Sequence, residues 1–241
     1  MSKPKKVVVT NFCGNIGKSS IALQLLMPRL GVKAENVFSV ETINGGIGDD
    51  GVDAQTLKAK LFNEMVDAIM LADSAIVDVG ASNVEEFFRK MELLEGSHEE
   101  FDYFVVPCTS DSHPQRETVK TVKALRALGV PYKKIKVVFN MVENIDDDIS
   151  QIFPQVVALG KLKDAVVNTD AVIFHSDAFN KLKDMKLTVQ GVLADDFDYR
   201  ANLNAVRGTD QEEHYLQRIA LRRLCSSVNK NLDNVYATLD L

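Results

Sequence analysis

The chain has 241 residues and a formal net charge of −6, with 46% hydrophobic and 26% charged residues. This length is enough for one large domain with its own core, and the acidic balance argues against a protein that coats nucleic acid along its whole surface. No apolar run approaches the roughly 18–20 residues of a membrane-spanning helix, so we predict no membrane span.

The cysteines and histidines are few and dispersed. Cys13, Cys108 and Cys225 are odd in number and lack the spacing of a zinc site. This usage is typical of a reducing compartment without a disulfide framework. The basic residues near the start precede only a short apolar run, which does not resemble a secretory signal. We therefore expect a cytoplasmic protein.

Short apolar runs alternate with segments of helical periodicity. The predicted strands are 7–9, 37–40, 75–79, 104–106, 135–139 and 171–174, and the apolar helix faces lie within 57–69, 84–91, 119–128 and 149–156. This alternation predicts an α/β fold in which a doubly wound, mostly parallel sheet is flanked by helices in three α/β/α layers. We expect residues 1–241 to form one domain, which ends in an amphipathic helix at about 210–228.

The segment after the first predicted strand has the order of a phosphate-binding loop. Two glycines, Gly14 and Gly17, are followed by Lys18, Ser19 and the start of a predicted helix. Backbone N–H groups and the helix N-terminus favour phosphate there, the lysine reaches the terminal phosphates, and the hydroxyl of Ser19 can bind Mg²⁺. A cap of the helix is the alternative role for Ser19. Phe12 stands where the general loop pattern begins with a glycine, so the front edge of the site is altered.

An acidic residue near the end of a buried strand supports this interpretation. Asp78 lies in the run 75–79 and precedes Gly80. A carboxylate in such a strand is costly unless it is paired or near a metal ion. It can hold Mg²⁺ together with Ser19, and the alternative is a cap for the following turn.

The second predicted strand is followed by Glu41 and a glycine-rich acidic segment. Its position matches a switch loop that nucleotide could order, although an ordinary exposed loop has the same composition. If a carboxylate here orients the attacking water, the candidates are Glu41, Asp49 and Asp50, with Glu41 preferred.

Asn140 comes directly after the apolar run of the strand predicted at 135–139. A side-chain amide offers both a donor and an acceptor to the edge of a purine. The residues that follow lack the lysine and aspartate that select guanine, so we predict adenine. A turn-forming role is the alternative.

These motifs resemble the ParA/MinD group of P-loop ATPases, which have a deviant Walker A loop. The sequence of residues 11–18 is most similar to that of StbB-type plasmid-stability proteins. The resemblance covers about residues 5–200. It implies ATP and Mg²⁺ as cofactors, a homodimer, contact with DNA, and a partner protein or DNA-binding adaptor. The implied catalytic residues are Lys18, Asp78 and Glu41, with Ser19 and Asp78 as metal ligands. The implied nucleotide contacts are Cys13, Gly14, Asn15, Ile16, Gly17, Lys18, Ser19, Ser20 and Asn140.

Two departures from the group concern hydrolysis. A signature lysine of the group contacts the partner subunit's nucleotide, and Cys13 stands at that position. A neutral thiol does not supply this charge, and Asn15 replaces a second small glycine. We predict that nucleotide binding survives these changes better than rapid turnover does.

Two basic sets are candidates for contact with DNA phosphates. The first is Arg116, Lys120 and Lys123, and the second is Arg218, Arg222 and Arg223. A solvated helix face is the alternative for each set.

Three functions fit the sequence. The leading one is an ATP-binding switch with slow, partner-stimulated hydrolysis that acts in plasmid stability, partition or conjugative transfer. The second is an interaction protein that binds nucleotide without turnover, and the third is a small-molecule kinase.

Overall fold

The computed structural model describes residues 4–40, 55–57 and 62–241. The strands within this part of the chain are β1 Lys6–Val9, β2 Val37–Val40, β3 Gln55–Leu57, β4 Ala75–Val79, β5 Tyr103–Cys108, β6 Ile135–Val142 and β7 Val172–Phe174. The α-helices are α1 Lys18–Ser20, α2 Met27–Leu30, α3 Phe62–Leu71, α4 Val84–Leu93, α5 Ser112–Ala127, α6 Ile149–Ile152, α7 Pro154–Lys161, α8 Asp177–Asp184, α9 Val189–Ala194, α10 Tyr199–Asn202 and α11 Gln211–Leu239. A π-helical turn, η1, covers Ile21–Leu26, and the 3₁₀ turns are η2 Ala34–Asn36, η5 Ala81–Asn83, η6 Ser97–Glu100, η7 Tyr132–Lys134 and η8 Leu203–Val206.

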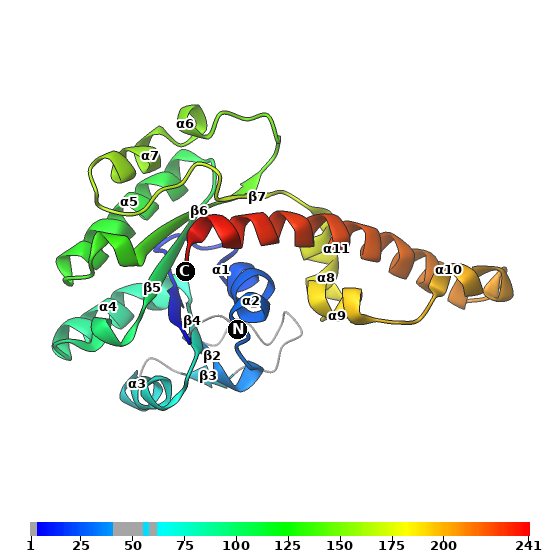
Figure 1. Cartoon of the computed structure of the whole chain (residues 1–241), viewed down its shortest axis with the longest axis horizontal. Helices are drawn as coiled ribbons and strands as arrows, with labels where there is room; N and C mark the ends of the chain where they lie inside the picture. Colours follow the sequence, from blue (N-terminus) through cyan, green and yellow to red (C-terminus); the bar gives the residue numbers. More distant parts are fainter. Residues whose placement is uncertain (1–3, 41–54, 58–61) are drawn as a thin grey trace.

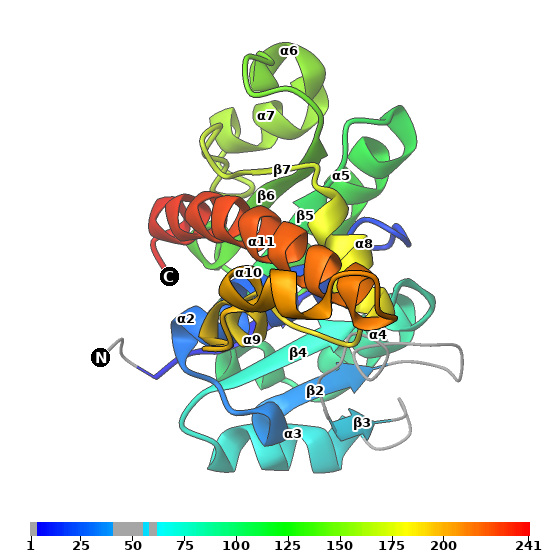
Figure 2. The same cartoon turned by 90° about the vertical axis from the view of Figure 1, so that its right-hand side faces the viewer.

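The strands form one parallel sheet in the order β3-β2-β4-β1-β5-β6-β7. Figure 2 shows this order, with β3 and β2 at one end and β7 at the other. The strand order changes direction at β1, which pairs with β4 on one side and with β5 on the other. Ligands of open α/β sheets bind at such a switch point, beyond the carboxyl ends of the strands.

Helices cover both faces of the sheet, as predicted (Figure 1). Successive strand residues point to opposite faces, so Val8 packs in one core while Val7 and Val9 pack in the other. The first core joins the sheet to α3, α4, α5 and α7. The second joins it to η1, α8, α9 and α11. The doubly wound three-layer α/β fold is confirmed.

The last helix is longer than predicted and ends at Leu239 instead of about residue 228. Its buried positions are Leu221, Cys225, Val228, Leu232, Val235 and Leu239. These alternate at spacings of four and three residues, which keeps one narrow apolar seam on the second core. Most residues at 229–234 are polar, so the sequence pattern did not predict that the helix continues through them. Asn231 also contributes, because it accepts from the Phe174 N–H at 3.1 Å and donates to the Val172 carbonyl at 2.8 Å, which satisfies the edge strand β7.

Two other element predictions need correction. Leu57 lies in strand β3 rather than on a helix, and the helix α3 begins at Phe62. Strand β6 continues past residue 139 to Val142, with an irregularity between Phe139 and Val142 and a positive φ of 57° at Met141. Within the described residues, no helix is both long enough and apolar enough to cross a bilayer.

Candidate nucleotide site

Asn11 anchors the start of the loop. It follows β1 directly and its side chain is fully buried. Its Nδ2 donates to the Pro107 carbonyl at 2.8 Å and to Oγ1 of Thr118 at 2.7 Å, while its Oδ1 accepts from the Cys13 N–H at 2.8 Å. A buried amide satisfied in this way orients the chain that leaves the strand. The sequence interpretation did not assign Asn11 a role, although a polar residue directly after a buried strand was a usable signal.

Gly17 allows the loop to turn into the helix. Its φ is 83°, in the left-handed region that glycine adopts without strain. A Cβ at this position would lie 2.3 Å from Nδ2 of Asn140. The same Nδ2 donates to the Ile16 carbonyl at 2.8 Å. Asn140 therefore braces the loop from β6, and the close approach requires a glycine at position 17.

Lys18 lies over the loop. Only 8% of the residue is exposed, and its Nζ donates to the Cys13 carbonyl at 2.6 Å. This contact fixes the position of the charge above the loop. An ammonium group has three donors, so it can also donate to a bound anion. The arrangement concentrates positive charge where backbone N–H groups and the helix N-terminus already favour an anion.

Ser19 and Asp78 come together as predicted. The hydroxyl of Ser19 donates to Oδ2 of Asp78 at 2.6 Å, which joins the first helical residues to the central strand β4. Asp78 is fully buried at the carboxyl end of that strand. A hydroxyl and a carboxylate at this distance are oxygen donors of the kind that Mg²⁺ prefers. In the described part of the chain, no group of three histidine, cysteine or acidic side chains could hold a metal by itself. The donor set thus fits a hard cation that completes its shell with phosphate and water.

The helix after the loop contains a π-helical turn, Ile21–Leu26, just before Pro28 in α2. Proline cannot donate to the carbonyl four residues earlier, and its ring crowds that carbonyl. The guanidinium of Arg29 instead donates to the Gln24 carbonyl at 2.9 Å and pairs with Asp233 of α11 at 2.7 Å. Arg29 therefore links the π-helical turn to the last helix.

A cavity of about 190 Å³ lies beside the loop. Its lining includes Ser20 and Asn140 from the loop side, together with Phe174 and Phe179. The cleft is lined by apolar and polar side chains in similar number, and Asn140 borders it next to the loop.

The thiol of Cys13 is neutral at physiological pH. Burial raises its pKa above the ordinary 9.0, and the charge of Lys18 opposes this increase without cancelling it. Because the thiolate is the nucleophile, this agrees with a space-filling role in the loop.

The structure brings together most of the predicted site. The loop residues, Lys18, Ser19, Asp78 and Asn140 all lie around the carboxyl ends of β1, β4 and β6. The loop residues Gly14 and Asn15 are exposed at its tip. Glu41, Asp49 and Asp50 lie outside the described residues, so the proposed water-orienting carboxylate stays a prediction.

The two basic sets lie on opposite faces of the sheet. Helix α5 packs on the first core and α11 on the second, so the sets form no continuous stripe (Figure 1). Lys120 lies 4.1 Å from the centre of the Phe12 ring and 3.6 Å from Glu85. Arg218 pairs with Asp195, and Arg222 donates to the Leu193 carbonyl at 3.2 Å.

Three of these basic side chains remain available. Arg116, Lys123 and Arg223 are exposed, and none of them forms an ion pair with another residue of the described part. Further along the chain, Lys136 is buried, and burial lowers its pKa.

No model of a known protein family matches the sequence, and no curated protein sequence matches it. Solved structures do match the fold. The McdA–ATP complex from Cyanothece has a TM-score of 0.50 at 13% identity, covering 97% of this chain and 98% of that chain. The MinC:MinD cell division complex from Aquifex aeolicus gives 0.51 at 12% identity, covering 92% and 96%. A ParA family ATPase from Chlorobium tepidum gives 0.51 at 12% identity, covering 89% and 97%.

These likenesses extend over nearly the whole of each chain. At such low identity they define the fold alone. The chain has the parallel, helix-flanked P-loop fold that the ParA and MinD structures share.

Proposed function

We propose that this protein is a nucleotide-dependent switch that binds ATP in the loop formed by residues 11–20. The arrangement of Lys18 beside the Ser19–Asp78 pair, at the switch point of the sheet, is the observation that carries the proposal. Lysine charge, helix N-terminus and loop N–H groups all favour phosphate at one place. The fold likeness to an ATP complex of McdA supports the same ligand.

The chain has separate groups for each part of the nucleotide. Lys18 would hold the terminal phosphates, and the base would enter the cavity between Asn140 and Phe179. Ser19 and Asp78 would hold Mg²⁺, which neutralises charge on phosphate oxygens when it is bound. We assign Asn140 both a bracing and a base-contacting role, because its amide already bonds to Ile16 at the border of the cavity.

The biological role we propose is plasmid stability, partition or conjugative transfer, carried out in the cytoplasm by a homodimer. The StbB-like wording of the loop and the ParA-type fold support this role. A partner protein or DNA-binding adaptor would bind one nucleotide state in preference to the other. The complex of MinD with MinC is an example of a partner bound to this fold. Because Cys13 adds no positive charge to the site, hydrolysis would be slow without that partner.

The test is ATP binding by Lys18→Ala, measured by calorimetry with Mg²⁺ present. Hydrogen bonds to charged groups are worth about 1.5–3 kcal/mol each, so we expect affinity to fall about tenfold to a hundredfold. The matched control is Lys33→Ala, which removes an exposed lysine outside the loop and should leave affinity unchanged. Equal ATP affinity in wild type and Lys18→Ala would refute the proposal.

A second candidate is an interaction protein that binds nucleotide without turning it over. Phe12 favours it, because its ring packs against Phe88 with centroids 5.6 Å apart and takes the place of the usual first glycine. ATP turnover measured with and without DNA separates the two candidates. Hydrolysis that disappears in Lys18→Ala excludes the second one.

DNA contact is the least constrained part of the proposal. Arg116 and Lys123 project from α5, whereas Arg223 projects from α11 on the other face. Each lost phosphate contact should lower the slope of log affinity against log salt by about one. Comparing Arg116→Ala with Lys123→Ala, and both with Arg223→Ala, identifies the face that DNA uses. If all three slopes match that of wild type, none of these three side chains contacts DNA.

A further inference from the structure

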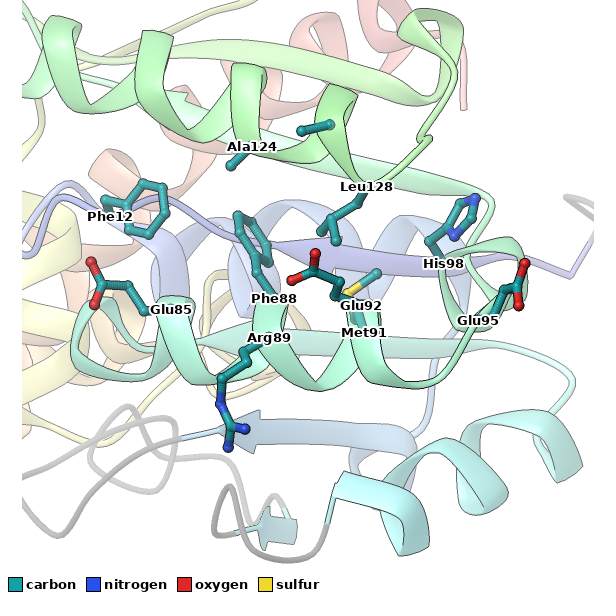
Figure 3. A pocket seen from close by; sticks show the side chains of 12 residues that line it. Phe12, Glu85, Phe88, Arg89, Met91, Glu92, Glu95, His98, Ala124 and Leu128 are labelled. Carbon is teal, nitrogen blue, oxygen red and sulfur yellow. The ribbon is translucent and has the colours of Figure 1, made fainter.

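A groove of about 590 Å³ lies between α4 and α5, on the side of the sheet opposite α11. Figure 3 shows apolar side chains along it, with Phe88 and Met91 from α4 facing Ala124 of α5 and Leu128 directly after α5. A depression of this volume with an apolar floor is a candidate binding site. Nothing in the nucleotide proposal accounts for it.

One end of the groove is formed by the nucleotide loop itself. Phe12 lines the groove, and its ring meets the edge of Phe88. Lys120 Nζ lies over the same ring, 4.1 Å from its centre. The Phe12 N–H also donates to Oγ1 of Thr121 on α5 at 3.1 Å. A molecule in the groove would therefore touch Phe12, which lies directly before Cys13 in the nucleotide loop.

The α4 rim of the groove is acidic, whereas α5 carries Lys120 and the exposed Lys123. The α4 side carries three glutamates, Glu85, Glu92 and Glu95. Lys120 offsets the first at 3.6 Å. Arg89, on the same rim, is bound by both carboxylate oxygens of Glu86 at 2.8–3.0 Å. Across the described chain, neither Glu92 nor Glu95 forms an ion pair, so two exposed negative charges face the middle and far end of the groove.

The same character continues past the end of α4. A second depression of about 490 Å³ shares Glu95 with the groove and is lined by Met70 and Leu94 beside Asp67 and Glu100. Met70 is 54% exposed and Leu94 38% exposed. The two depressions thus meet at Glu95, and both have apolar and acidic side chains in their linings.

We propose that this groove is the docking site for a basic amphipathic segment of a partner protein. The segment would place apolar side chains between Phe88 and Leu128 and its lysines or arginines against Glu92 and Glu95. Charge complementarity favours such a partner over a second copy of this chain, because the copy carries a net charge of −6. A helix of about three turns matches the length of α4, which has 10 residues.

Docking by itself requires no nucleotide. A second consequence rests on the proposed ATP site: an occupant that presses on Phe12 changes the loop and therefore the affinity for ATP. By linkage, ATP then changes the affinity for the segment by the same factor.

The experiment uses two fluorescent helical peptides of about 14 residues. Both carry leucines on one face, and the other face carries lysines in the probe and glutamates in the control peptide. Binding is measured by anisotropy against the full-length protein. We expect the lysine peptide to bind and the glutamate peptide to bind at least about tenfold more weakly.

Two protein variants locate the site. Ala127→Arg puts a long side chain into the groove from an exposed position of α5, and it should weaken the lysine peptide by about tenfold or more. Ala220→Arg makes the same change on exposed α11 and should have no effect. Glu92→Gln combined with Glu95→Gln should weaken binding about threefold to tenfold and reduce its salt dependence.

Several outcomes would overturn the proposal. They are absence of binding, equal binding of the two peptides, and equal binding by wild type and Ala127→Arg. A wild-type dimer that Ala127→Arg dissociates in sedimentation velocity would show that a second copy occupies the groove instead. Lys18→Ala separates the two proposals, because it should lose ATP while it still binds the lysine peptide.

Discussion

The loop of residues 11–20 and the first half of α11 both hold charged side chains in hydrogen bonds, yet they use them differently. At the loop, Lys18 and Asp78 are 8% and 0% exposed and lie at the carboxyl edge of the sheet, beside a cavity. On α11, Arg218 and Arg222 instead bond to Asp195 and to carbonyl groups of the preceding segment. The first cluster forms the proposed phosphate site, and the second joins the last helix to the segment before it. A charge pattern therefore indicates a ligand only where the fold leaves it facing the ends of parallel strands.

The largest effect that can test this contrast is expected for Gly17→Ala. The added Cβ would lie 2.3 Å from Asn140 Nδ2 at a residue with φ of 83°, so the loop must shift. We expect ATP binding to be lost and the free energy of unfolding to fall by about 1–3 kcal/mol. Calorimetry and denaturant unfolding measure the two effects.

Gly208→Ala is the matched control for this variant. Gly208 has φ of 75°, and a Cβ there would meet nothing within 4 Å. It imposes similar backbone strain without the collision and lies far from the loop in sequence. If Gly208→Ala costs as much stability as Gly17→Ala, the contact with Asn140 is not the cause.

The next effect concerns the metal. Asp78→Asn keeps the shape of the side chain and removes the charge that faces Ser19. We expect the Mg²⁺-dependent gain in ATP affinity to fall about tenfold or more, because oxygen-rich Mg²⁺ sites depend on carboxylate charge. ATP binding measured in EDTA is the control and should change by less than about threefold. An unchanged Mg²⁺ dependence would remove Asp78 from the metal site.

A smaller effect is expected on α11. The Arg218 hydrogen bond, and after it the Phe197 N–H, lower the pKa of Asp195 below its ordinary 3.8. The stability that this carboxylate contributes is therefore present above that ordinary value and is lost as pH falls through the lowered, folded pKa. We expect Arg218→Ala to lower the melting temperature at neutral pH by about 2–4 °C, and the difference from wild type to shrink in acid.

Arg223→Ala is the control, because Arg223 is exposed on the same helix and forms no ion pair with the rest of the described chain. Its melting temperature should match that of wild type at both pH values. Thermal unfolding followed by circular dichroism measures all three proteins. Equal melting of Arg218→Ala and Arg223→Ala would show that the Asp195 pair contributes nothing.

The smallest effect concerns the thiol of Cys13. Burial raises its pKa above 9.0, and burial also raises the pKa of Cys225 to about 11 and that of Cys108 to about 12. We expect alkylation to be slow at neutral pH and to increase only as pH passes 9.0, first at Cys13. Mass spectrometry of iodoacetamide-treated protein gives the order. Rapid labelling of Cys13 near neutral pH would instead indicate that its thiol is a reactive nucleophile.

The predictions from sequence succeeded where a short-range pattern was sufficient. Buried runs such as 75–79 became central strands, and the Gly-Lys-Ser order placed the loop at the end of β1. They failed where a distant partner decided the outcome. Leu57 has a helical neighbour pattern but pairs with Val40 of β2. The last helix continues to Leu239, past polar residues such as Asn231, which bonds to β7.

By itself, the sequence determined six of the seven described strands, several of the helices between them and the position of the phosphate-type loop, because hydrophobic periodicity and glycine spacing are local properties. Tertiary structure decided which polar residues face a cavity and which are used within the fold. Phe12 is the clearest case: in the sequence it is a departure from a glycine, and in the fold it forms one wall of a groove between α4 and α5. The physical reason is that burial, distance and charge pairing depend on residues more than a hundred positions apart, such as Phe12 and Thr121.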